Sequence, residues 1–399
     1  PLSSLTPAEC TSRAEEVLPQ ILGILGLDGA QATPAAAAAA AAIPAAAGPE
    51  PAGLTAQKVK DFRDVVEYYF AQGWTDGLPV VAVTAETVRE FVEFVGRDPR
   101  EVVATVKHLN RECTVEMAAV AAAMAGCRKD YLPLLLASLE SMQPSIDTAL
   151  MQSTTGQCQL MIVNGPIRRQ LGFNGGGNVF GPGYRANATL GRAMRLVAMN
   201  AFGLRPGEFD QATQGTPAKY SFCIAENEEE SPWEPLHVER GFAADANVIT
   251  THFARSTLHV ENRTSNKAEE VLLTIAESMS YPGAWPAGRG CTVVMGPEHA
   301  QLVARQGWSK QQAKQFIWEH WGRTRGELRR LGLKGDGLTS EVRSNAAASE
   351  PADDEFVHRG ESPDSILLVV AGARNAGVSA VVPAVRAMFH SKETAPPRG

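Results

Sequence analysis

The stretch around Cys113 contains the clearest candidate nucleophile in the sequence. It reads His108-Leu-Asn-Arg-Glu-Cys-Thr-Val-Glu and joins a predicted strand, residues 102–106, to a predicted helix that begins near Cys113. A thiol near a helix N-terminus has a lowered pKa, because the helix dipole favours the thiolate. Cys113 is therefore a candidate catalytic nucleophile, with Glu112 or His108 as its base. The alternative is a small buried core thiol beside an ordinary first-turn carboxylate.

An acidic segment follows the predicted strand at residues 220–225. Here Glu226 and His237 are candidate acid–base residues, and a divalent metal held by the two is an alternative. The sequence identifies no cofactor. A solvated acidic turn would explain the charges of residues 228–230, but not the nearby Trp233, which with Arg240 is a candidate substrate contact.

A glycine-rich loop is the third candidate. It runs Asn174-Gly-Gly-Gly-Asn-Val-Phe-Gly-Pro-Gly-Tyr-Arg-Ala-Asn into a predicted helix at residues 188–202. Glycines let backbone N–H groups approach a ligand, and a helix N-terminus favours an anion. Asn187 is the expected N-cap, and Arg185 is suited to clamp a carboxylate or phosphate. The candidate binding residues are Asn174, Gly175, Gly176, Arg185 and Asn187; a purely structural loop is the alternative.

Two stretches of the sequence follow the same pattern. Residues 134–142 and 271–279 are both predicted helices that end in Glu-Ser-Met, and each precedes a Cys, an apolar strand, a Gly-Pro pair and another helix. The order and nearly equal spacing predict an internal duplication, although any α/β protein repeats strand–turn–helix units. Behind the second Gly-Pro pair stands His299, a candidate binding residue, where the first copy has Arg168.

These elements predict an α/β fold of two related halves. Continuous apolar strands between helices indicate helices on both faces of the sheet. Residues 1–53 are expected to form a helix and an Ala/Pro-rich linker arm, followed by halves at residues 54–245 and 246–399. The linker is suited to lie on a neighbouring subunit, so we expect a homo-oligomer, with the site between the two halves.

Composition narrows the classes of function. The net charge of -7 provides no basic stripe for nucleic acid, and no apolar run is long enough to span a membrane. The six cysteines are scattered without a Cys-x-x-Cys pair, which excludes common zinc and thioredoxin spacings and indicates reduced thiols in the cytoplasm. Because the chain starts with Pro, a removed organelle-import segment remains an alternative.

Several motifs resemble those of a largely uncharacterised bacterial family. They are Trp74-Thr-Asp-Gly-Leu-Pro-Val-Val, Arg111-Glu-Cys-Thr-Val-Glu, Ile162-Val-Asn-Gly-Pro-Ile and Ser231-Pro-Trp-Glu-Pro-Leu-His-Val-Glu-Arg-Gly. This family is often associated with small thiol or selenol proteins that carry a Sec-Gly-Ser-Cys motif. The resemblance covers roughly residues 66–383 and implies a catabolic or sulfur-related enzyme, without naming a reaction.

The sequence thus favours an enzyme that acts on a small anionic metabolite. Lyase or hydrolase chemistry by Cys113, Glu226 and His237 is the leading hypothesis, and thiol oxidoreductase chemistry stays open. The alternatives are a metal-dependent enzyme at His237 and a non-catalytic binding or assembly protein.

Overall fold

The computed structural model describes residues 12, 62–146, 154, 156–280, 289–332 and 352–394. The chain divides into two units, Pro1–Gly53 with Thr324–Glu355, and Leu54–Arg323 with Phe356–Gly399. Of the first unit the structure describes mainly α14 (Arg325–Arg330), which begins with a capping box of Thr324 and Glu327. The predicted arm at residues 1–53 lies, apart from residue 12, outside the described residues. Everything below concerns the second unit.

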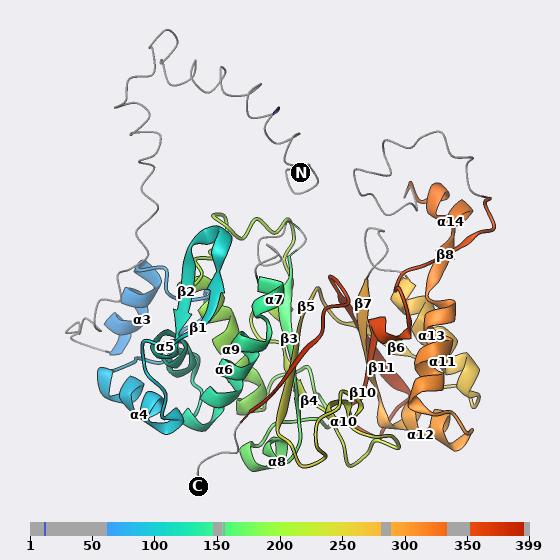
Figure 1. Ribbon diagram of the computed structural model, residues 1–399, viewed down its shortest axis with the longest axis horizontal. Coiled ribbons are helices and arrows are strands. Elements are labelled where there is room, and N and C mark those ends of the chain that lie inside the picture. The colour runs from blue at the N-terminus through green and yellow to red at the C-terminus, as the bar shows by residue number, and fades with distance from the viewer. Residues whose placement is uncertain are drawn as a thin grey trace. The chain divides into compact units, whose positions relative to one another are not determined.

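The centre of this unit is a mixed sheet of eight strands (Figure 1). Its strands are β3 (Cys158–Asn164), β4 (Cys223–Ala225), β5 (Val248–Ala254), β6 (Leu258–Glu261), β7 (Gly290–Met295), β10 (Ile366–Val370), β11 (Val378–Ala384) and β12 (His390–Glu393). The order is β10-β7-β11-β5-β3-β4, with β12 beside β5 and β6 beside β11. Only the pairs β3–β4 and β7–β10 are parallel. The predicted α/β class is therefore confirmed in its general form.

Two extended segments form the middle of the sheet. One runs through β5 into β6, and the other through β11 into β12. They pass each other antiparallel, because β6 pairs with β11 and β12 pairs with β5, and they meet where Ala384 faces Ala254. The second strand of each segment, β6 or β12, therefore pairs with the first strand of the other segment; we call this arrangement the exchange of strands.

The sheet curls until its two edges approach each other. The amide of Asn227, just after β4, donates to the carbonyl of Val370 at the end of β10 at 2.7 Å, and Gly372 donates to Gly175 at 2.8 Å. One core cluster draws on β3, β4, β5, β7, β10 and β11, with Leu160 and Ile162 as the contribution from the middle of β3. Alternate residues of that strand, Met161 and Val163, belong to a different core. The cluster is thus the inner face of the curled sheet.

Helices cover the outer face in two groups. The first core contains residues of α4 (Ala85–Val95), α5 (Val115–Ala125), α6 (Leu132–Ser141) and α9 (Arg185–Asn200), and the second contains residues of α11 (Ala268–Ser280), α12 (Pro297–Arg305) and α13 (Lys310–His320). We predicted helices on both faces of the sheet. Instead the inner face of the curled sheet packs mainly on itself. Because both faces of each strand are still buried, this arrangement explains the continuous apolar strands equally well.

The remaining described elements are short or lie at the margins. They are α3 (Phe62–Ala71), α7 (Gln143–Ile146), α8 (Ile167–Leu171), α10 (Leu236–Glu239), the antiparallel pair β1 (Val102–Val106) and β2 (Arg111–Thr114), and a third sheet of β8 (Gly322–Thr324) and β9 (Phe356–His358). Among the described helices none is both long and apolar enough to cross a membrane.

The apolar run at residues 78–83 predicts a buried strand and residues 309–331 predict one long helix, and the structure differs from both predictions. Residues 78–83 form no strand: Pro79 lacks an N–H group, Val81 donates to Met124 at the end of α5, and Val80 is the one deeply buried side chain of the segment. The long helix predicted at residues 309–331 stops at His320. The chain then passes through Gly322, where a Cβ atom would lie 2.4 Å from the carbonyl oxygen of Val357.

Candidate functional site

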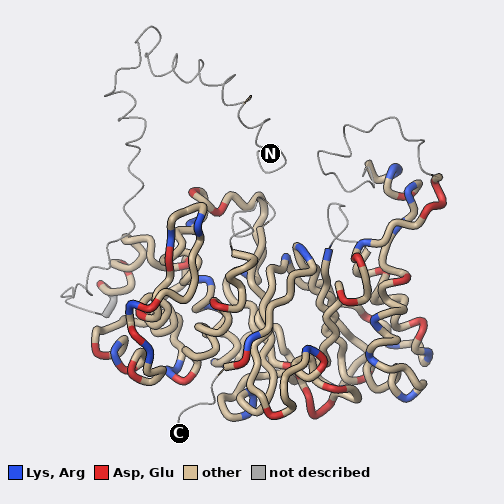
Figure 2. Tube along the Cα trace, viewed as in Figure 1, with Lys and Arg blue, Asp and Glu red and all other residues tan. Residues whose placement is uncertain are grey.

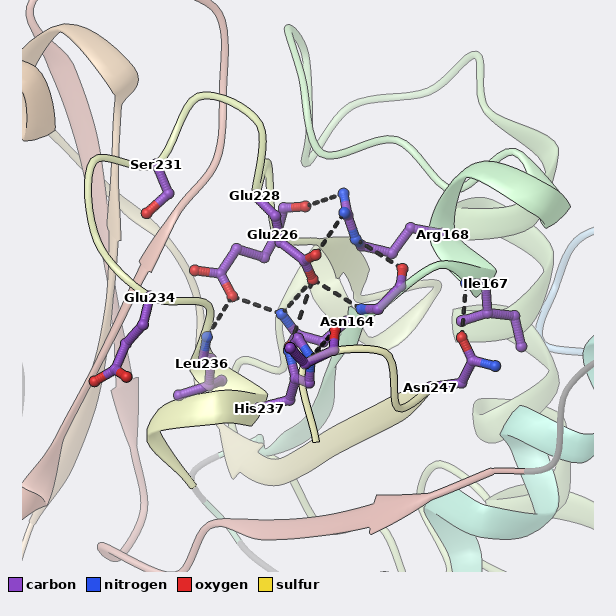
Figure 3. A network of polar contacts seen from close by, with 12 residues as sticks. Asn164, Ile167, Arg168, Glu226, Glu228, Ser231, Glu234, Leu236, His237 and Asn247 are labelled. Atoms are coloured by element: carbon purple, nitrogen blue, oxygen red, sulfur yellow. Dashed lines mark hydrogen bonds and ion pairs between the residues drawn. The ribbon is translucent and has the colours of Figure 1, made fainter. Parts of the chain in front are cut away.

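A buried polar network lies at the carboxyl ends of β3 and β4 (Figure 3). Asn164 is the last residue of β3, Glu226 follows β4 directly, and His237 lies on the short helix α10. All three are completely buried. Crevices at the carboxyl ends of parallel strands are where α/β proteins usually bind ligands, so this position favours a functional role.

Asn164 and Glu226 are joined directly. The Asn164 amide Nδ2 donates to Glu226 Oε2 at 2.6 Å and to Glu228 Oε1 at 3.0 Å, and the Leu236 amide donates to Glu226 Oε2 at 2.8 Å. Because two carboxylate oxygens face it, the Asn164 nitrogen must be the atom that points toward them. The backbone N–H of Gly165 also donates to Glu228 Oε1 at 2.8 Å.

Arg168 ties the acidic loop to the turn after β3. Its Nη2 lies 2.6 Å from Glu228 Oε2, its Nη1 donates to the Glu226 carbonyl at 2.8 Å, and its Nε donates to the Gly165 carbonyl at 3.1 Å. Hydrogen bonds from Arg168 also hold the pKa of Glu229 below its usual value. The network reaches the surface through these two acidic side chains, which are 14% and 46% exposed.

Three side chains of the network each keep one buried polar atom without a hydrogen-bond partner. They are Asn164 Oδ1, Glu226 Oε1 and His237 Nδ1. The His237 Nε2 atom lies 3.2 Å from the Ala244 carbonyl, so Nε2 carries the proton and Nδ1 is the free position. That Nδ1 atom lies 3.8 Å from Glu228 Oε1. Buried polar atoms without a partner are rare and often mark a ligand, a water or a catalytic role.

Burial favours the neutral form of Glu226. Desolvation raises the pKa of this carboxyl group above its usual value, and the charge of Glu228 raises it further. The charge of Lys310 and the bonds from Leu236 and Asn164 oppose the shift without cancelling it. Since Oε2 accepts two N–H groups, the proton belongs on Oε1, the oxygen without a partner.

A second buried charged group lies next to the network. Lys310 Nζ and Lys314 Nζ each lie 2.7 Å from an oxygen of Glu239, and both lysines are nearly inaccessible. Burial raises the pKa of Glu239, but the two ammonium groups outweigh it and lower the pKa below its usual value. The pKa values of the two carboxyl groups are therefore shifted in opposite directions, lowered for Glu239 of α10 and raised for Glu226, which precedes that helix.

The glycine-rich loop packs against the same end of the sheet. A Cβ atom at Gly175 would lie 2.8 to 2.9 Å from backbone atoms of residues 225–227. Asn187 Nδ2 donates to the carbonyls of Asn174 and Cys223, and its Oδ1 accepts from the Asn174 amide, while Asn174 Oδ1 accepts from Gly176. Gly175 is therefore needed for contact between backbones, and the loop buttresses Glu226.

Two residues of that loop have roles other than those predicted. The helix begins at Arg185 with Tyr184 as N-cap, so Asn187 lies inside the first turn and is not the cap. Arg185 is exposed, and its Nε donates to the Gly126 carbonyl at the end of α5. Arg185 of α9 therefore caps the carboxyl end of α5. Its position beside Gly126 gives no support to the predicted binding of an anion by its guanidinium group.

Three other candidates make structural contacts. Trp233 Nε1 donates to the Trp308 carbonyl, and Arg240 Nη2 donates to the Phe389 carbonyl. His299 is buried between Ser379 Oγ at 2.8 Å and the Asn262 carbonyl at 3.0 Å. These contacts occupy the polar atoms that substrate binding would use.

The predicted nucleophile lies in another environment. Cys113 belongs to β2, and Thr114 is the N-cap of α5, so the thiol precedes the helix. Burial raises the pKa of Cys113 to about 12, the reverse of the lowered pKa we predicted. Glu112 and His108 are exposed. The structure therefore does not present Cys113 as a thiolate.

Asn164 and Arg168 belong to the network and were not predicted as site residues. Each had a signal in the sequence. Asn164 is a polar residue at the end of an otherwise apolar strand, directly before Gly-Pro, and Arg168 occupies the position that His299 holds in the second pattern. A buried strand end followed by a turn is where a polar side chain needs a partner.

Two surface pockets lie away from the network. One of about 670 Å³ is lined by residues 75–77, part of α9 and residues 206–220, and one of about 580 Å³ is lined by residues of α4 and the segment 127–130. In the larger pocket the charges are paired, Asp210 with Arg195 and Lys219, and Asp76 with the adjacent Arg192. We favour the buried network, because three completely buried side chains with an unpartnered polar atom lie together there, at the carboxyl ends of two parallel strands.

Among the described residues no group of three or more His, Cys, Asp or Glu side chains is arranged to hold a metal ion. Comparisons with protein-family models, with curated proteins and with solved structures gave no match to this chain.

Proposed function

We propose that the protein is an enzyme that performs acid–base chemistry on a small molecule at the Glu226–His237 network. The observation that carries the proposal is the set of three completely buried side chains that each keep an unpartnered polar atom. Structural polar networks are normally satisfied in full, whereas catalytic groups await a reacting partner.

Glu226 and His237 suit opposite roles. Neutral Glu226 donates the proton on Oε1 to a leaving group, and His237 accepts a proton at Nδ1. In a lyase the proton comes from a carbon of the substrate and the products are an alkene and the protonated leaving group. In a hydrolase it comes from a water molecule whose oxygen attacks the substrate. Return of the proton from His237 to Glu226 restores the resting state in both.

Arg168 and Asn164 position the acid in this proposal. The guanidinium of Arg168 is already bound by two carboxylates and two carbonyls, and Asn164 holds Glu226 Oε2. Arg168 therefore offers no free guanidinium to an anion, and Arg185, whose Nε donates to the Gly126 carbonyl, forms no hydrogen bond or ion pair with the network within the described residues. The support from geometry therefore extends to acid–base chemistry and does not include the anionic substrate expected from the sequence. Substrate entry requires movement of the loop that carries Glu228 and Glu229.

A screen of small hydroxy-, amino- and thio-carboxylates with the purified protein in deuterated and in ¹⁸O-labelled water tests the proposal. Carbon-bound deuterium in the remaining substrate identifies the reversible proton abstraction of a lyase, and ¹⁸O in the product identifies a hydrolase. We expect Glu226→Gln and His237→Gln to lower turnover by about 100-fold or more, the range of general acid–base catalysis.

The matched control is Arg169→Gln. Arg169 is 73% exposed and touches the outer side of the network only through Glu229 at 3.4 Å. It should keep wild-type turnover. Gln at position 226 still accepts from Leu236 and Asn164, so the variant should fold; full activity in a folded Glu226→Gln protein would refute the assignment.

We also propose that the chain contains a duplicated unit, β3-α8-β4-β5-β6 and β7-α12-β10-β11-β12. In each unit the first two strands are parallel neighbours, β3 with β4 and β7 with β10. The third strand lies antiparallel beside the first, β5 beside β3 and β11 beside β7. The fourth strand pairs with the third strand of the other unit, β6 with β11 and β12 with β5. Both Gly-Pro turns lie against the start of the antiparallel strand: a Cβ at Gly165 would lie 2.0 Å from the Ala246 carbonyl oxygen, and one at Gly296 2.1 Å from that of Val378. This pairing assigns β5 to the first copy.

A further inference from the structure

Four arginines gather where the central strands bend, at the end of the sheet opposite the polar network. Arg255 follows β5, Arg289 precedes β7, Arg359 follows β9 and Arg386 follows β11. Ala384 faces both Ala254 and Gly290 in the strand register, so three of these arginines lie within two residues of one point of the sheet. The backbone N–H of Arg289 donates to the Arg359 carbonyl, which brings the fourth to the same place.

Three of these arginines, Arg255, Arg289 and Arg386, lack the carboxylates that normally accompany buried guanidinium groups. Within the part of the chain that the structure describes, Arg255, Arg289 and Arg386 form no ion pair with Asp or Glu, whereas Arg168 and Arg192 do. Figure 2 shows the contrast along the trace, with basic positions at the upper end of the central strands and acidic positions along the loops below. Among the described residues, this end of the sheet therefore gathers basic side chains without acidic partners for three of them.

Buried N–H donors in the cluster also lack acceptors. The Nε atoms of Arg255 and Arg289 are inaccessible and have no hydrogen-bond partner. Arg289 uses Nη1 to donate to the Val385 carbonyl, which holds the guanidinium in place while Nε stays free. An unsatisfied donor on a charged group costs more than one on a neutral group, so an acceptor with negative charge would stabilise this arrangement.

The charges repel one another strongly enough to affect proton binding. Burial lowers the pKa of Arg289 to about 10, and the charges of Arg255 and Arg386 add to the shift. Burial likewise lowers the pKa of Arg359 to about 10, with contributions from Arg289 and Arg255. A fold that concentrates like charges without carboxylates is typical of a site for an anionic ligand.

We propose that Arg255, Arg289, Arg359 and Arg386 form a binding site for a phosphate or sulfate group. A tetrahedral dianion presents several acceptor oxygens to guanidinium groups from different directions, which suits arginines contributed by separate strand ends. Arg386 is exposed and the cluster opens to solvent on its side. A monocarboxylate has one negative charge and two oxygens, and suits this cluster less well.

The site is separate from the Glu226–His237 network. The seven residues of β3 connect the two ends of the sheet, and at about 3.3 Å per residue they span about 20 Å. One small substrate cannot reach both. The anion therefore binds as an effector, a second substrate or a structural ligand, and its binding does not depend on the proposed catalysis.

Thermal unfolding of the whole protein with added inorganic phosphate tests the site. Because a ligand that binds the folded state raises its stability, phosphate and sulfate should raise Tm by at least about 2 °C more than chloride does at equal ionic strength. Acetate should behave like chloride. Calorimetric titration with phosphate should give one site per chain. Phosphate that acts only as well as chloride would overturn the proposal.

Two variants and a control locate the effect. Arg289→Gln should raise Tm in phosphate-free buffer, because it removes repulsion, and should abolish the response to phosphate. Arg386→Gln breaks no hydrogen bond within the described residues and should reduce the response even if the first variant folds poorly. Arg263→Gln removes an exposed arginine paired with Glu261 and should respond like wild type. An unchanged response in Arg386→Gln and Arg289→Gln would refute the assignment.

Discussion

Glu226 is the acidic residue of its loop that the fold buries completely, and burial raises the pKa of its carboxyl group. Glu228 and Glu229 face a guanidinium group and stay near water, whereas Glu226 is enclosed beside Leu236 and held by one oxygen only. Its raised pKa means that the folded protein binds a proton there more tightly than the unfolded chain does. This makes the stability of the protein depend on pH in a defined direction.

The contribution of Glu226 to stability should therefore fall as pH rises above its unfolded pKa. The contribution of Glu226 is complete below its ordinary value of 4.5 and is lost as pH rises through its raised folded pKa. The slope from one such group is at most about 1.4 kcal/mol per pH unit. Buried His252 and half-buried His390, whose pKa values burial lowers, titrate in both proteins, so urea unfolding of wild type is compared with that of Glu226→Gln at each pH. The stability of wild type relative to the variant should fall across this pH range; a constant difference would contradict a raised pKa at Glu226.

The described thiols should resist alkylation in the folded protein. Cys113, Cys127, Cys158 and Cys291 are buried, and burial raises the pKa of each to about 12. At neutral pH almost no thiolate is present to react. Pulse alkylation followed by peptide mass spectrometry should label these four residues only at the rate of global unfolding. Rapid labelling of Cys113 alone would restore it as a nucleophile.

The residues of the candidate site were partly predictable. Glu226 and His237 stood out because a strand ran directly into a segment rich in polar types. Cys113 stood out for the same reason, but sequence spacing does not show that β1 and the helix α5 enclose the thiol. Asn164 was missed: its signal is a single polar residue that ends an apolar strand directly before Gly-Pro, and one position has no periodicity to mark it.

At the scale of elements, the apolar strands were predictable and the strands with buried polar residues were not. Residues 102–106 form a strand as predicted, and residues 366–370, whose continuous apolar run also predicts a strand, form one too. β5 was not predicted, because Thr250, Thr251 and His252 interrupt its apolar pattern. In the fold these side chains are buried with partners: Thr251 contacts Ser138 Oγ at 2.7 Å and His252 contacts Thr292 Oγ1 at 2.8 Å. Such pairs come from distant segments and leave no local signal.

The two Gly-Pro turns should tolerate no side chain. Gly165→Ala and Gly296→Ala each place a Cβ about 2 Å from a backbone carbonyl oxygen, and each should cost about 3 kcal/mol or more of unfolding free energy. Gly296 has an ordinary negative φ, so its cost reports the close approach alone. Urea unfolding measures both.

Gly172→Ala is the control for this comparison. Gly172 has a positive φ but no atom within 4 Å of a Cβ, so the change should cost only about 1 kcal/mol. A Gly296→Ala variant no less stable than Gly172→Ala would show that the turn can move away from β11.

At the scale of the whole unit, the exchanged strands should make the two sides of the sheet unfold together. β5 depends on β12 for one edge, and β11 depends on β6. Opening either side removes hydrogen bonds from the other, so local opening of one side alone is unfavourable. Native-state hydrogen exchange should give the amides of β5 and β11 the same opening free energy. Two clearly different values would mean that the sides are independent.

The pairing of β5 with the distant strand β12 also has a consequence for the protein during its synthesis. Thr251 leaves the ribosome long before His390, its partner in β12, has been translated. Throughout that interval one edge of β5 exposes N–H and C=O groups that can pair with any other extended chain. A nascent chain of this kind needs protection until its own distant strand arrives. Its yield in a cell should therefore depend on the supply of chaperones that bind unfinished chains, and on the speed of translation between these two strands.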